Sequence, residues 1–378
     1  MPPREPPAHP PGRLEGGLSP ELLDARCRPQ PIALRALLEA LASRLPDILV
    51  PPDDLLAAQT FAAPLPPCWD WVMLETRLGP RGGPVDLLAS VTEAGTGRAR
   101  VREALNELTP DAEARLSGVL PLLRTWAAGA PPVDTSGVVF LEWDAPLQGA
   151  ARGPLAFLSI DPSFWRADNA CAERRTDVDL LPWALAPGAA TPEWTPLCAA
   201  VGALLGALPE QAFGLCAVST APRGHDAARV FVRMAPWQVG PWLRAAGWPG
   251  DSARVERWAQ ALYRPWETAF VQMELRREGN AYVPGPYLGL EPSQTTASYG
   301  ERASRARWLD AAIAAGIVHA DQARAVLDWP GAWVGDVGSS SGLICTSYHL
   351  KLVLNGGQES AKAYLGAHVR AVPAGGSD

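Results

Sequence analysis

The chain has 378 residues, a mass of 40.2 kDa and a net charge of −7, and 47% of its residues are hydrophobic while 19% are charged. This composition provides enough apolar material for a large core and excludes a chain that is disordered throughout. An acidic isoelectric point near 5.4 argues against a basic nucleic-acid-binding face. No apolar stretch reaches the roughly 18 residues of a membrane span, so we expect a cytoplasmic protein that binds neither nucleic acid nor membranes.

The cysteine and histidine residues are too dispersed to predict a metal site. The six cysteines show no CxxC spacing, and the five histidines form no HExxH motif, so neither set indicates a zinc site. Dinucleotide-binding, Walker and nucleophile-elbow motifs are absent as well. Of the 33 basic residues only two are lysines, Lys351 and Lys362, and both lie in one C-terminal segment. The function must therefore be sought in the arrangement of elements rather than in a single motif.

The chain divides by composition into three regions. Residues 1–30 are rich in proline and glycine and are expected to form a disordered arm, and residues 371–378 a flexible tail. Residues 31–370 carry regular patterns and are predicted to form one domain.

Within this domain, helical segments alternate with pairs of strand-like runs. The predicted helices are 32–45, 55–59, 98–108, 111–127, 195–208, 236–246, 251–262, 301–315 and 321–329. The strand-like runs form five pairs: 68–78 with 84–91, 137–144 with 155–161, 213–220 with 228–234, 268–275 with 286–292, and 346–354 with 360–369. Asn355-Gly356-Gly357 joins the last pair and is a strong signal for a tight β-hairpin.

Five hairpins separated by helices predict ten antiparallel strands. An open sheet of ten strands would leave two unpaired edges, whereas a closed barrel removes both and lets the helices cover its outside. We therefore predict an α/β (α+β) fold with a ten-stranded antiparallel barrel, built from five ββ hairpins and surrounded by α-helices. An unrelated α+β fold with the same order of elements is the alternative.

Alternation along the strands places charged residues on the inner face of this barrel. In the run 346–354, for example, Leu350 and Leu352 face outward while His349 and Lys351 face inward. The predicted lumen holds the cations Arg77, Arg229, Arg233, Lys351 and Lys362 and the carboxylates Glu75, Glu142, Asp144, Asp161, Glu274 and Glu291. A solid core would not accept so many charges, because an unpaired buried charge is costly, but a solvent-filled lumen would.

The order of elements resembles the αββα repeat of the aromatic prenyltransferases, in which five repeats form the PT (or ABBA) barrel around a solvent-filled lumen. Lys362-Ala363-Tyr364, on the second strand of the last hairpin, is similar to the Lys-x-Tyr strands of the indole-prenylating branch. The resemblance covers residues 32–370 in architecture. It implies transfer of an allylic prenyl group from a diphosphate to an indole, a phenol or a Trp/Tyr-containing peptide in natural-product biosynthesis.

This resemblance suggests a role for each charged or aromatic lumen residue. The residues expected to bind the diphosphate are Arg77, Arg229, Arg233, Lys351 and Lys362. Tyr287 and Tyr364 would shield the allylic cation by cation–π attraction. Glu75 or Glu142 would hydrogen-bond the acceptor and take up its proton, and Glu75 matches the position of a first-hairpin glutamate in the indole branch. No cofactor is required, although the carboxylates could hold Mg²⁺, which some bacterial members of the fold use.

Other interpretations remain open at this point. The lumen carboxylates oppose a diphosphate unless they pair with the cations or with a metal ion. The chain could therefore be a non-catalytic protein of the same fold that binds a peptide or small molecule for partner biosynthetic enzymes. Arg229 and Arg233 could instead form structural salt bridges, and Glu75 and Arg77 a strand ion pair. The last hairpin could be a solvated edge of the sheet.

Overall fold

The computed structural model describes residues 29–79, 82–93, 96–130, 137–147, 153–159, 195–210, 212, 214–219, 227–292 and 302–371. The predicted arm and tail lie almost wholly outside these residues, as does Asp161. Only Pro29 and Gln30 of the arm are described, and the backbone N–H of Gln30 donates to the carbonyl of Val369. No helix among the described residues is long and apolar enough to cross a membrane.

The strands form a closed antiparallel barrel, as the element order predicts. Their order is β11-β1-β2-β3-β4-β5-β6-β7-β8-β10-β9, and β10 also pairs with β11, which closes a ring of ten strands and leaves β9 outside it. The strands of the ring are β1 (Trp71–Leu78), β2 (Asp86–Thr92), β3 (Val138–Trp143), β4 (Leu155–Ser159), β5 (Gly214–Ser219), β6 (Ala227–Met234), β7 (Ala269–Glu278), β8 (Ala281–Pro292), β10 (Ser340–Asn355) and β11 (Gln358–Arg370). The last hairpin is part of the closed wall because β11 pairs with both β1 and β10, so the solvated-edge interpretation is wrong.

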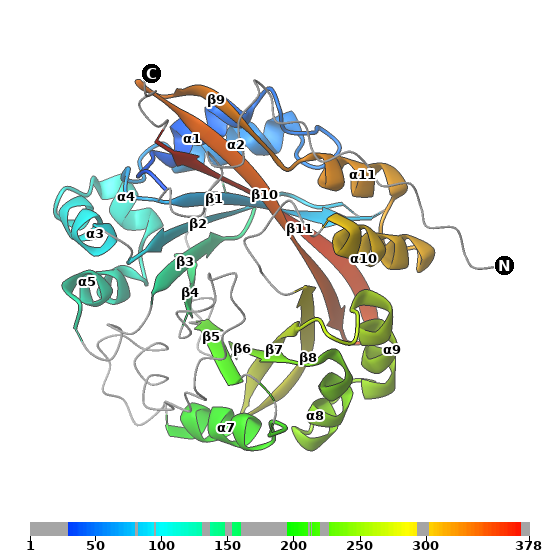
Figure 1. Cartoon of the computed structure of the whole chain (residues 1–378). Helices are drawn as coiled ribbons and strands as arrows, with labels where there is room; N and C mark the ends of the chain where they lie inside the picture. Colours follow the sequence, from blue (N-terminus) through cyan, green and yellow to red (C-terminus); the bar gives the residue numbers. More distant parts are fainter. Residues whose placement is uncertain are drawn as a thin grey trace, which may run out of the picture.

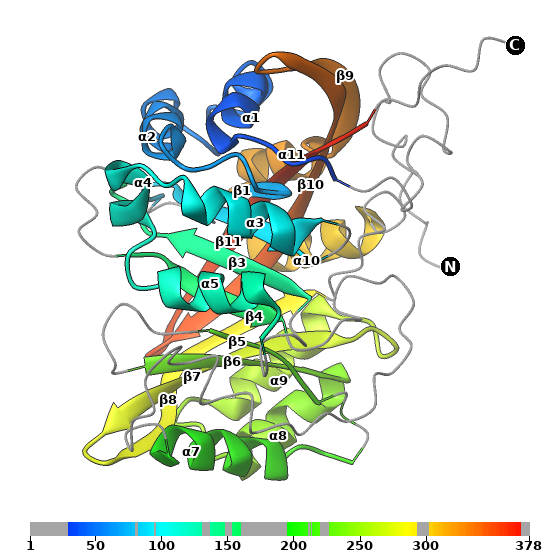
Figure 2. The ribbon, with the colours of Figure 1, turned by 90° about the vertical axis from the view of Figure 1, so that its left-hand side faces the viewer.

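Ten α-helices among the described residues surround the ring of strands on its outside (Figure 1). They are α1 (Leu34–Leu41), α2 (Pro52–Ala62), α3 (Gly97–Asn106), α4 (Pro110–Arg115), α5 (Leu120–Ala128), α7 (Thr195–Gly206), α8 (Val239–Ala245), α9 (Ser252–Leu262), α10 (Arg302–Ala314) and α11 (Ala320–Asp328), with a short 3₁₀ helix, η5 (Pro236–Gln238). Figure 2 shows α3 and α5 lying across the strands of the first two hairpins. The predicted helix 111–127 is wrong as a single element, because Gly118 adopts a left-handed conformation (φ 83°) that separates α4 from α5.

The main hydrophobic core lies between the outer face of the barrel and the helices. Outward residues such as Leu74, Leu141 and Leu350 are buried there, together with Trp126 and Trp143. A second, smaller cluster lies inside the barrel and contains Ala217, Phe231 and Phe270, with Phe140 and Phe157 packed against it. The alternation of side chains therefore separates a helix-covered apolar face from a lumen face that is part aromatic and part charged.

The two ends of the barrel differ. The strand register places the turns between paired strands at one end, here called the hairpin end, while the connections to the helices lie at the other, the helix end. At the hairpin end the β10–β11 turn uses Gly356 (φ 56°) and Gly357 (φ 86°), as the Asn-Gly-Gly signal predicts. At the helix end β9 (Gly331–Val337), which the sequence analysis missed, pairs with the first half of β10 and extends the sheet beyond the barrel.

Candidate functional site

A charged layer forms inside the barrel, toward its hairpin end, where β1, β8, β10 and β11 meet. Across the closing pair of strands, Lys351 lies opposite Lys362, and His349 lies opposite Tyr364. On the other side of β11, Glu75 lies opposite the same Tyr364. The two lysines, the only ones in the chain, are thus neighbours on the lumen face rather than on the outer surface.

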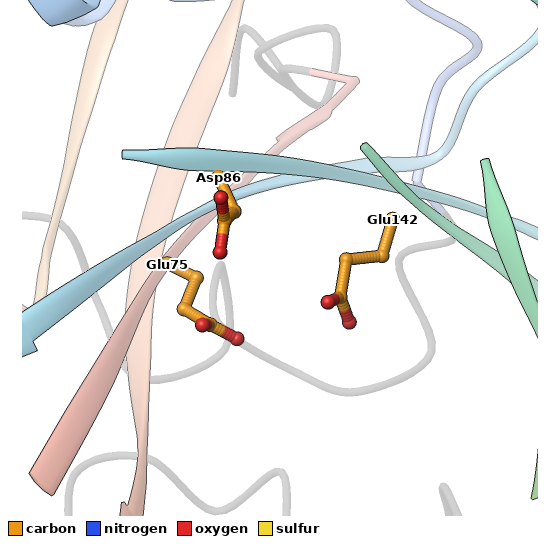
Figure 3. A group of neighbouring side chains, drawn as sticks. All are labelled: Glu75, Asp86 and Glu142. Carbon is orange, nitrogen blue, oxygen red and sulfur yellow. The ribbon is translucent and has the colours of Figure 1, made fainter. Parts of the chain in front are cut away.

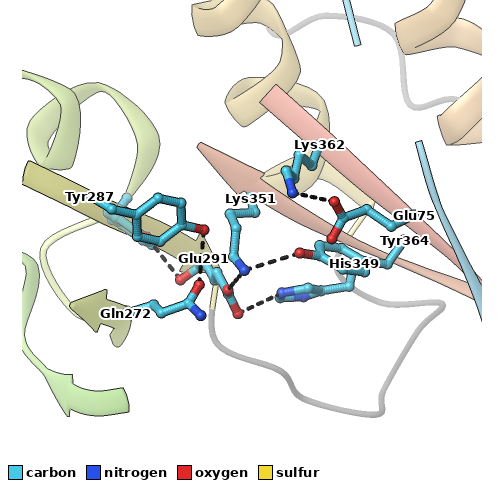
Figure 4. Close-up of polar contacts among 9 residues, drawn as sticks. Glu75, Gln272, Tyr287, Glu291, His349, Lys351, Lys362 and Tyr364 are labelled. Atoms are coloured by element: carbon cyan, nitrogen blue, oxygen red, sulfur yellow. Dashed lines mark hydrogen bonds and ion pairs between the residues drawn. The ribbon is translucent and has the colours of Figure 1, made fainter. Parts of the chain in front are cut away.

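Glu291 of β8 anchors the first half of this layer (Figure 4). Its carboxylate pairs with Lys351 Nζ at 2.9 Å and with His349 Nε2 at 2.8 Å, and its residue is only 3% exposed. Lys351 Nζ also donates to the Tyr364 hydroxyl at 3.0 Å. Burial alone would raise the pKa of Glu291, but the charge of Lys351 and the hydrogen bonds with Lys351 and His349 outweigh it and lower that pKa to about 2. Glu291 is therefore a firmly ionised counter-ion of Lys351.

Glu75 of β1 has the same relation to the second lysine. Its carboxylate forms an ion pair with Lys362 Nζ, and the residue is 1% exposed. Burial acts to raise the pKa of Glu75, but the charges of Lys362 and Lys351 outweigh it and lower the pKa to about 2. A carboxylate with so low a pKa is a weak proton acceptor at neutral pH, although it can still accept hydrogen bonds.

Three carboxylates converge next to this pair, as Figure 3 shows. Oxygen atoms of Glu75, Asp86 and Glu142 all lie within 4.8 Å of one another, and all three residues are buried. Asp86 accepts a hydrogen bond from the backbone N–H of Ala145 at 2.7 Å. Burial and the neighbouring Glu75 nevertheless raise the pKa of Asp86 to about 7, because like charges so close together oppose its ionisation.

This carboxylate trio, Glu75, Asp86 and Glu142, fits a hard divalent cation. Mg²⁺ and Ca²⁺ prefer oxygen ligands at about 2.0–2.6 Å, so opposite ligands of one ion stand about 4–5 Å apart, in keeping with the observed spacing. A bound cation would also remove the repulsion that raises the pKa of Asp86. The trio is thus the place in the described lumen where the Mg²⁺ considered in the sequence analysis would be held.

Asp86 was missed by the sequence analysis. It is followed by the apolar pair Leu87 and Leu88, so the start of β2 reads as a buried strand with no chemistry of its own. Two features could have identified Asp86 as a lumen residue. It lies on the same face of β2 as Ser90, which faces the lumen, and it lies directly opposite Glu75 across the hairpin.

A third group on the far wall combines aromatic and polar side chains. The guanidinium of Arg229 lies 4.7 Å from the ring centre of Tyr287, and the Tyr287 hydroxyl donates to Gln272 Oε1 at 3.2 Å. Burial would lower the pKa of Arg229, but Tyr287 and Glu142 outweigh it and raise that pKa above its ordinary value. Arg229 is therefore held as a cation facing the carboxylates.

Other residues named in the sequence analysis lie away from this layer. Arg77 and Asp144 are exposed to solvent at the hairpin end. Arg233 is half-buried and lies opposite Phe270, toward the helix end. Glu274 faces the lumen opposite Arg229 and pairs with Arg276 at 3.2 Å. Of the five cations expected to bind diphosphate, the structure thus brings Arg229, Lys351 and Lys362 together.

A cavity of about 90 Å³ lies between the charged layer and the aromatic cluster. Its apolar wall consists of Met73, Leu88, Phe140, Phe157, Ala217, Phe231 and Phe270. Its polar wall consists of Glu142, Glu291, His349, Lys351 and Tyr364. The cavity therefore presents a hydrocarbon-binding side and a charged side to one ligand.

Several buried polar atoms on the lumen face have no hydrogen-bond partner among the described residues. They include Ser90 Oγ, Ser219 Oγ, Gln272 Nε2 and His368 Nδ1. An unsatisfied buried polar group costs about 1–3 kcal/mol, so native proteins usually satisfy it with water or a ligand. These unsatisfied atoms indicate that water or a polar ligand occupies part of the lumen and that side chains do not fill it completely.

The barrel fits the PT fold, since its ten antiparallel strands close around a lumen that carries charged and aromatic side chains. No protein-family model matches the sequence, and no curated protein matches it significantly.

Proposed function

We propose that the protein is an aromatic prenyltransferase that moves an allylic prenyl group from a diphosphate to an indole, a phenol or a Trp/Tyr-containing peptide. The observation that carries this proposal is the cavity between the charged layer and the phenylalanines. A prenyl diphosphate has the same division, with a hydrocarbon chain at one end and an anion at the other. The lumen cations and Tyr364 meet at the boundary between the two parts.

In this reaction the bond between the allylic carbon and the diphosphate oxygen breaks, and its electron pair leaves on the diphosphate. Lys351, Lys362 and Arg229 would stabilise that departing charge, while Tyr287 and Tyr364 would face the allylic cation. A carbon of the aromatic acceptor then forms the new C–C bond, and its proton passes to a carboxylate. Glu75 would orient the acceptor by hydrogen bonding, since its low pKa makes it a weak base, and Glu142 would take up the proton.

The charge balance of the lumen makes this proposal dependent on a divalent cation. The described carboxylates of the charged layer are Glu75, Asp86, Glu142 and Glu291, and its cations are Arg229, Lys351 and Lys362, while Glu274 is paired with Arg276. A diphosphate would add about three negative charges to a site whose acids already outnumber its bases. Mg²⁺ at the carboxylate trio would supply the missing positive charge and would hold the diphosphate beside the two lysines.

A second candidate is a non-catalytic protein of this fold that binds a peptide or a small molecule for partner enzymes. It is favoured by a specific observation, because both lysines are already neutralised by Glu291 and Glu75. The cavity is also smaller than the roughly 300–1,000 Å³ of typical ligand pockets, so a donor and an acceptor would both need the lumen to widen.

The two lysines allow a direct test of diphosphate binding. Protein labelled with ¹³C at the lysine side chains should give two lysine signals, assigned with Lys351→Arg and Lys362→Arg. We expect a non-hydrolysable dimethylallyl diphosphate analogue to shift both signals in Mg²⁺, and EDTA to weaken the binding strongly. Calorimetric titration should show at least tenfold weaker binding, about 1.4 kcal/mol, for Lys362→Ala. Arg324→Ala, at an exposed ion pair on α11, is the matched control and should bind normally.

Unmoved lysine signals and no heat of binding, with or without Mg²⁺, would count against the transferase. The second candidate would then be tested with indole-containing peptides alone. Binding of such a peptide without any response to the diphosphate analogue would support it.

A further inference from the structure

A second group of lumen residues lies at the helix end of the cavity and has no role in the function proposed above. Its centre is His368 on β11, whose ring centre lies 3.9 Å from that of Trp71 on β1. Ser90 of β2 lies directly opposite Trp71 on the other side. Three adjacent strands thus place a serine, a tryptophan and a histidine in one row across the inner face of the barrel.

The hydrogen bond made by His368 determines where its proton lies. His368 Nε2 accepts a hydrogen bond from Arg370 Nε at 2.9 Å. Burial and the nearby charge of Arg370 lower the pKa of His368 to about 3, so the ring is neutral at physiological pH. A neutral imidazole has one donor and one acceptor nitrogen, so the proton is on Nδ1. This Nδ1–H is buried and has no acceptor among the residues that the structure describes.

Ser90 leaves a second polar atom unsatisfied in the same row. Its Oγ is buried with no partner in the described part of the chain, and the residue is only 1% exposed. Two groups without partners beside one tryptophan indicate a position built to meet a polar atom that the described residues do not supply. The guanidinium of Arg370, bonded to the far nitrogen of the ring, makes Nδ1–H a stronger donor and favours an oxygen acceptor with negative or partly negative charge.

The row is continuous with the cavity of the candidate site. Met73 and Tyr364 line the cavity, and each continues along its own strand, on the same face, to Trp71 and His368 respectively. Between Tyr364 and His368 the inward position is Gly366, whose lack of a side chain leaves room that Ser347 Oγ and Met73 border. Ser90 and His368 are buried, whereas Trp71 and Met73 are half-buried, so the row is not fully enclosed on the side formed by β1.

We propose that the His368 Nδ1–H, with Trp71 and Ser90 beside it, is a second lumen subsite that binds an aromatic compound through a carbonyl or carboxylate oxygen. Trp71 offers an aromatic surface to the ring of the compound, and His368 donates to its oxygen. In the proposed function, on which this role rests, the subsite holds the acceptor while its reactive ring reaches toward the charged layer. The binding itself does not depend on a diphosphate or on a metal ion.

Three indoles with side chains of similar length test the oxygen requirement: indole-3-acetate, indole-3-acetamide and 3-ethylindole. Calorimetric titration of the full chain, without diphosphate, should show at least one oxygen-bearing compound binding at least tenfold more tightly than 3-ethylindole. A preference for the acetate identifies a carboxylate as the ligand group, and similar binding of the acetamide identifies a carbonyl. Equal binding of all three compounds, or binding of none, overturns the subsite.

Variants at His368 separate recognition from folding. His368→Phe keeps a ring against Trp71 but has no N–H, and it should bind all three indoles equally weakly. His368→Gln retains a side-chain N–H donor and should recover part of the preference for oxygen. His319→Phe replaces an exposed histidine and should behave as wild type. If His368→Phe melts like wild type and keeps the preference, His368 is not the recognition element. If His368→Phe fails to fold, the other two variants and NMR provide the test. The proposal is overturned if His368→Gln and Ser90→Ala keep the full preference for oxygen-bearing indoles and the ¹⁵N signals of His368 place its proton on Nε2.

The transferase proposal can fail while this subsite stands. Selective indole binding that depends on His368, without any product when dimethylallyl diphosphate and Mg²⁺ are added, would retain the subsite and remove the transferase. If His368→Phe leaves product formation unchanged and the protein shows no preference for the oxygen-bearing indoles, the transferase is retained and the subsite is removed.

Discussion

Replacement of Glu291 by leucine should lower the free energy of unfolding by about 3–5 kcal/mol, the usual cost of removing one partner from a buried ion pair. Glu291 is 3% exposed and is the shared partner of Lys351 and His349. Leucine has a similar volume but cannot accept a hydrogen bond, so it leaves the ammonium of Lys351 buried without its ion-pair partner. The loss should appear in urea or thermal unfolding.

Two controls show whether this loss comes from the unpaired charge. The double variant Glu291→Leu/Lys351→Met removes both charges and should recover most of the stability. Glu39→Leu breaks an exposed pair with Arg35 on α1 and should cost at most about 1 kcal/mol. A small loss in Glu291→Leu, equal to that of Glu39→Leu, would mean that water reaches Lys351 and replaces the carboxylate.

The pH dependence of this effect has a definite sign. The pKa of Glu291 is lowered from 4.5 to about 2 by folding, so its stabilising contribution is complete above pH 4.5. That contribution is lost as the pH falls through about 2, because the folded protein must then take up the proton. The difference in stability between wild type and Glu291→Leu should therefore shrink over this acidic range.

Replacement of Asp86 by asparagine should stabilise the protein at neutral pH in the presence of EDTA. The pKa of Asp86 is raised from 3.8 to about 7 by folding, so the folded state retains a proton that the unfolded state releases. Stability is therefore lost as the pH rises from 3.8 to about 7, and it changes little above that range. At about 1.36 kcal/mol per pKa unit, the gain above pH 7 is at most about 4 kcal/mol. Asparagine can still accept from the Ala145 N–H through its side-chain oxygen.

If the carboxylate trio binds Mg²⁺, the ion should reverse the stability advantage of Asp86→Asn over wild type. The cation favours the ionised form of Asp86, so Mg²⁺ should raise the melting temperature of wild type but not of Asp86→Asn. Unfolding measured above pH 7 and below pH 3.8, with EDTA and with Mg²⁺, separates the effect of Asp86 protonation on stability from the effect of metal binding. A wild-type protein that Mg²⁺ leaves unchanged would speak against a metal at the trio, and an Asp86→Asn protein that is less stable in EDTA would mean that Asp86 is ionised in the fold.

The sequence predicts the barrel well because each local signal agrees with the whole fold. The alternation of Leu350 and Leu352 with His349 and Lys351 assigns the two faces of β10, and Asn355-Gly356-Gly357 sets its turn. It misses β9, because this strand contains two glycines and an aspartate and is stabilised by pairing with the long β10 rather than by its own propensity. It also joins α4 and α5, since a single glycine does not by itself break a helical pattern.

By itself the sequence determines the ten strands, their faces and the charged character of the lumen, since these follow from periodicity and turn chemistry. Which charges meet is decided only by the tertiary structure. Lys362 and Glu75 are separated by 287 residues in the chain, and they pair because β11 closes the barrel against β1. The same closure places Asp86 and Glu142 beside Glu75, and His368 beside Trp71. Such distances depend on strand register across the ring, a long-range property that no local pattern encodes.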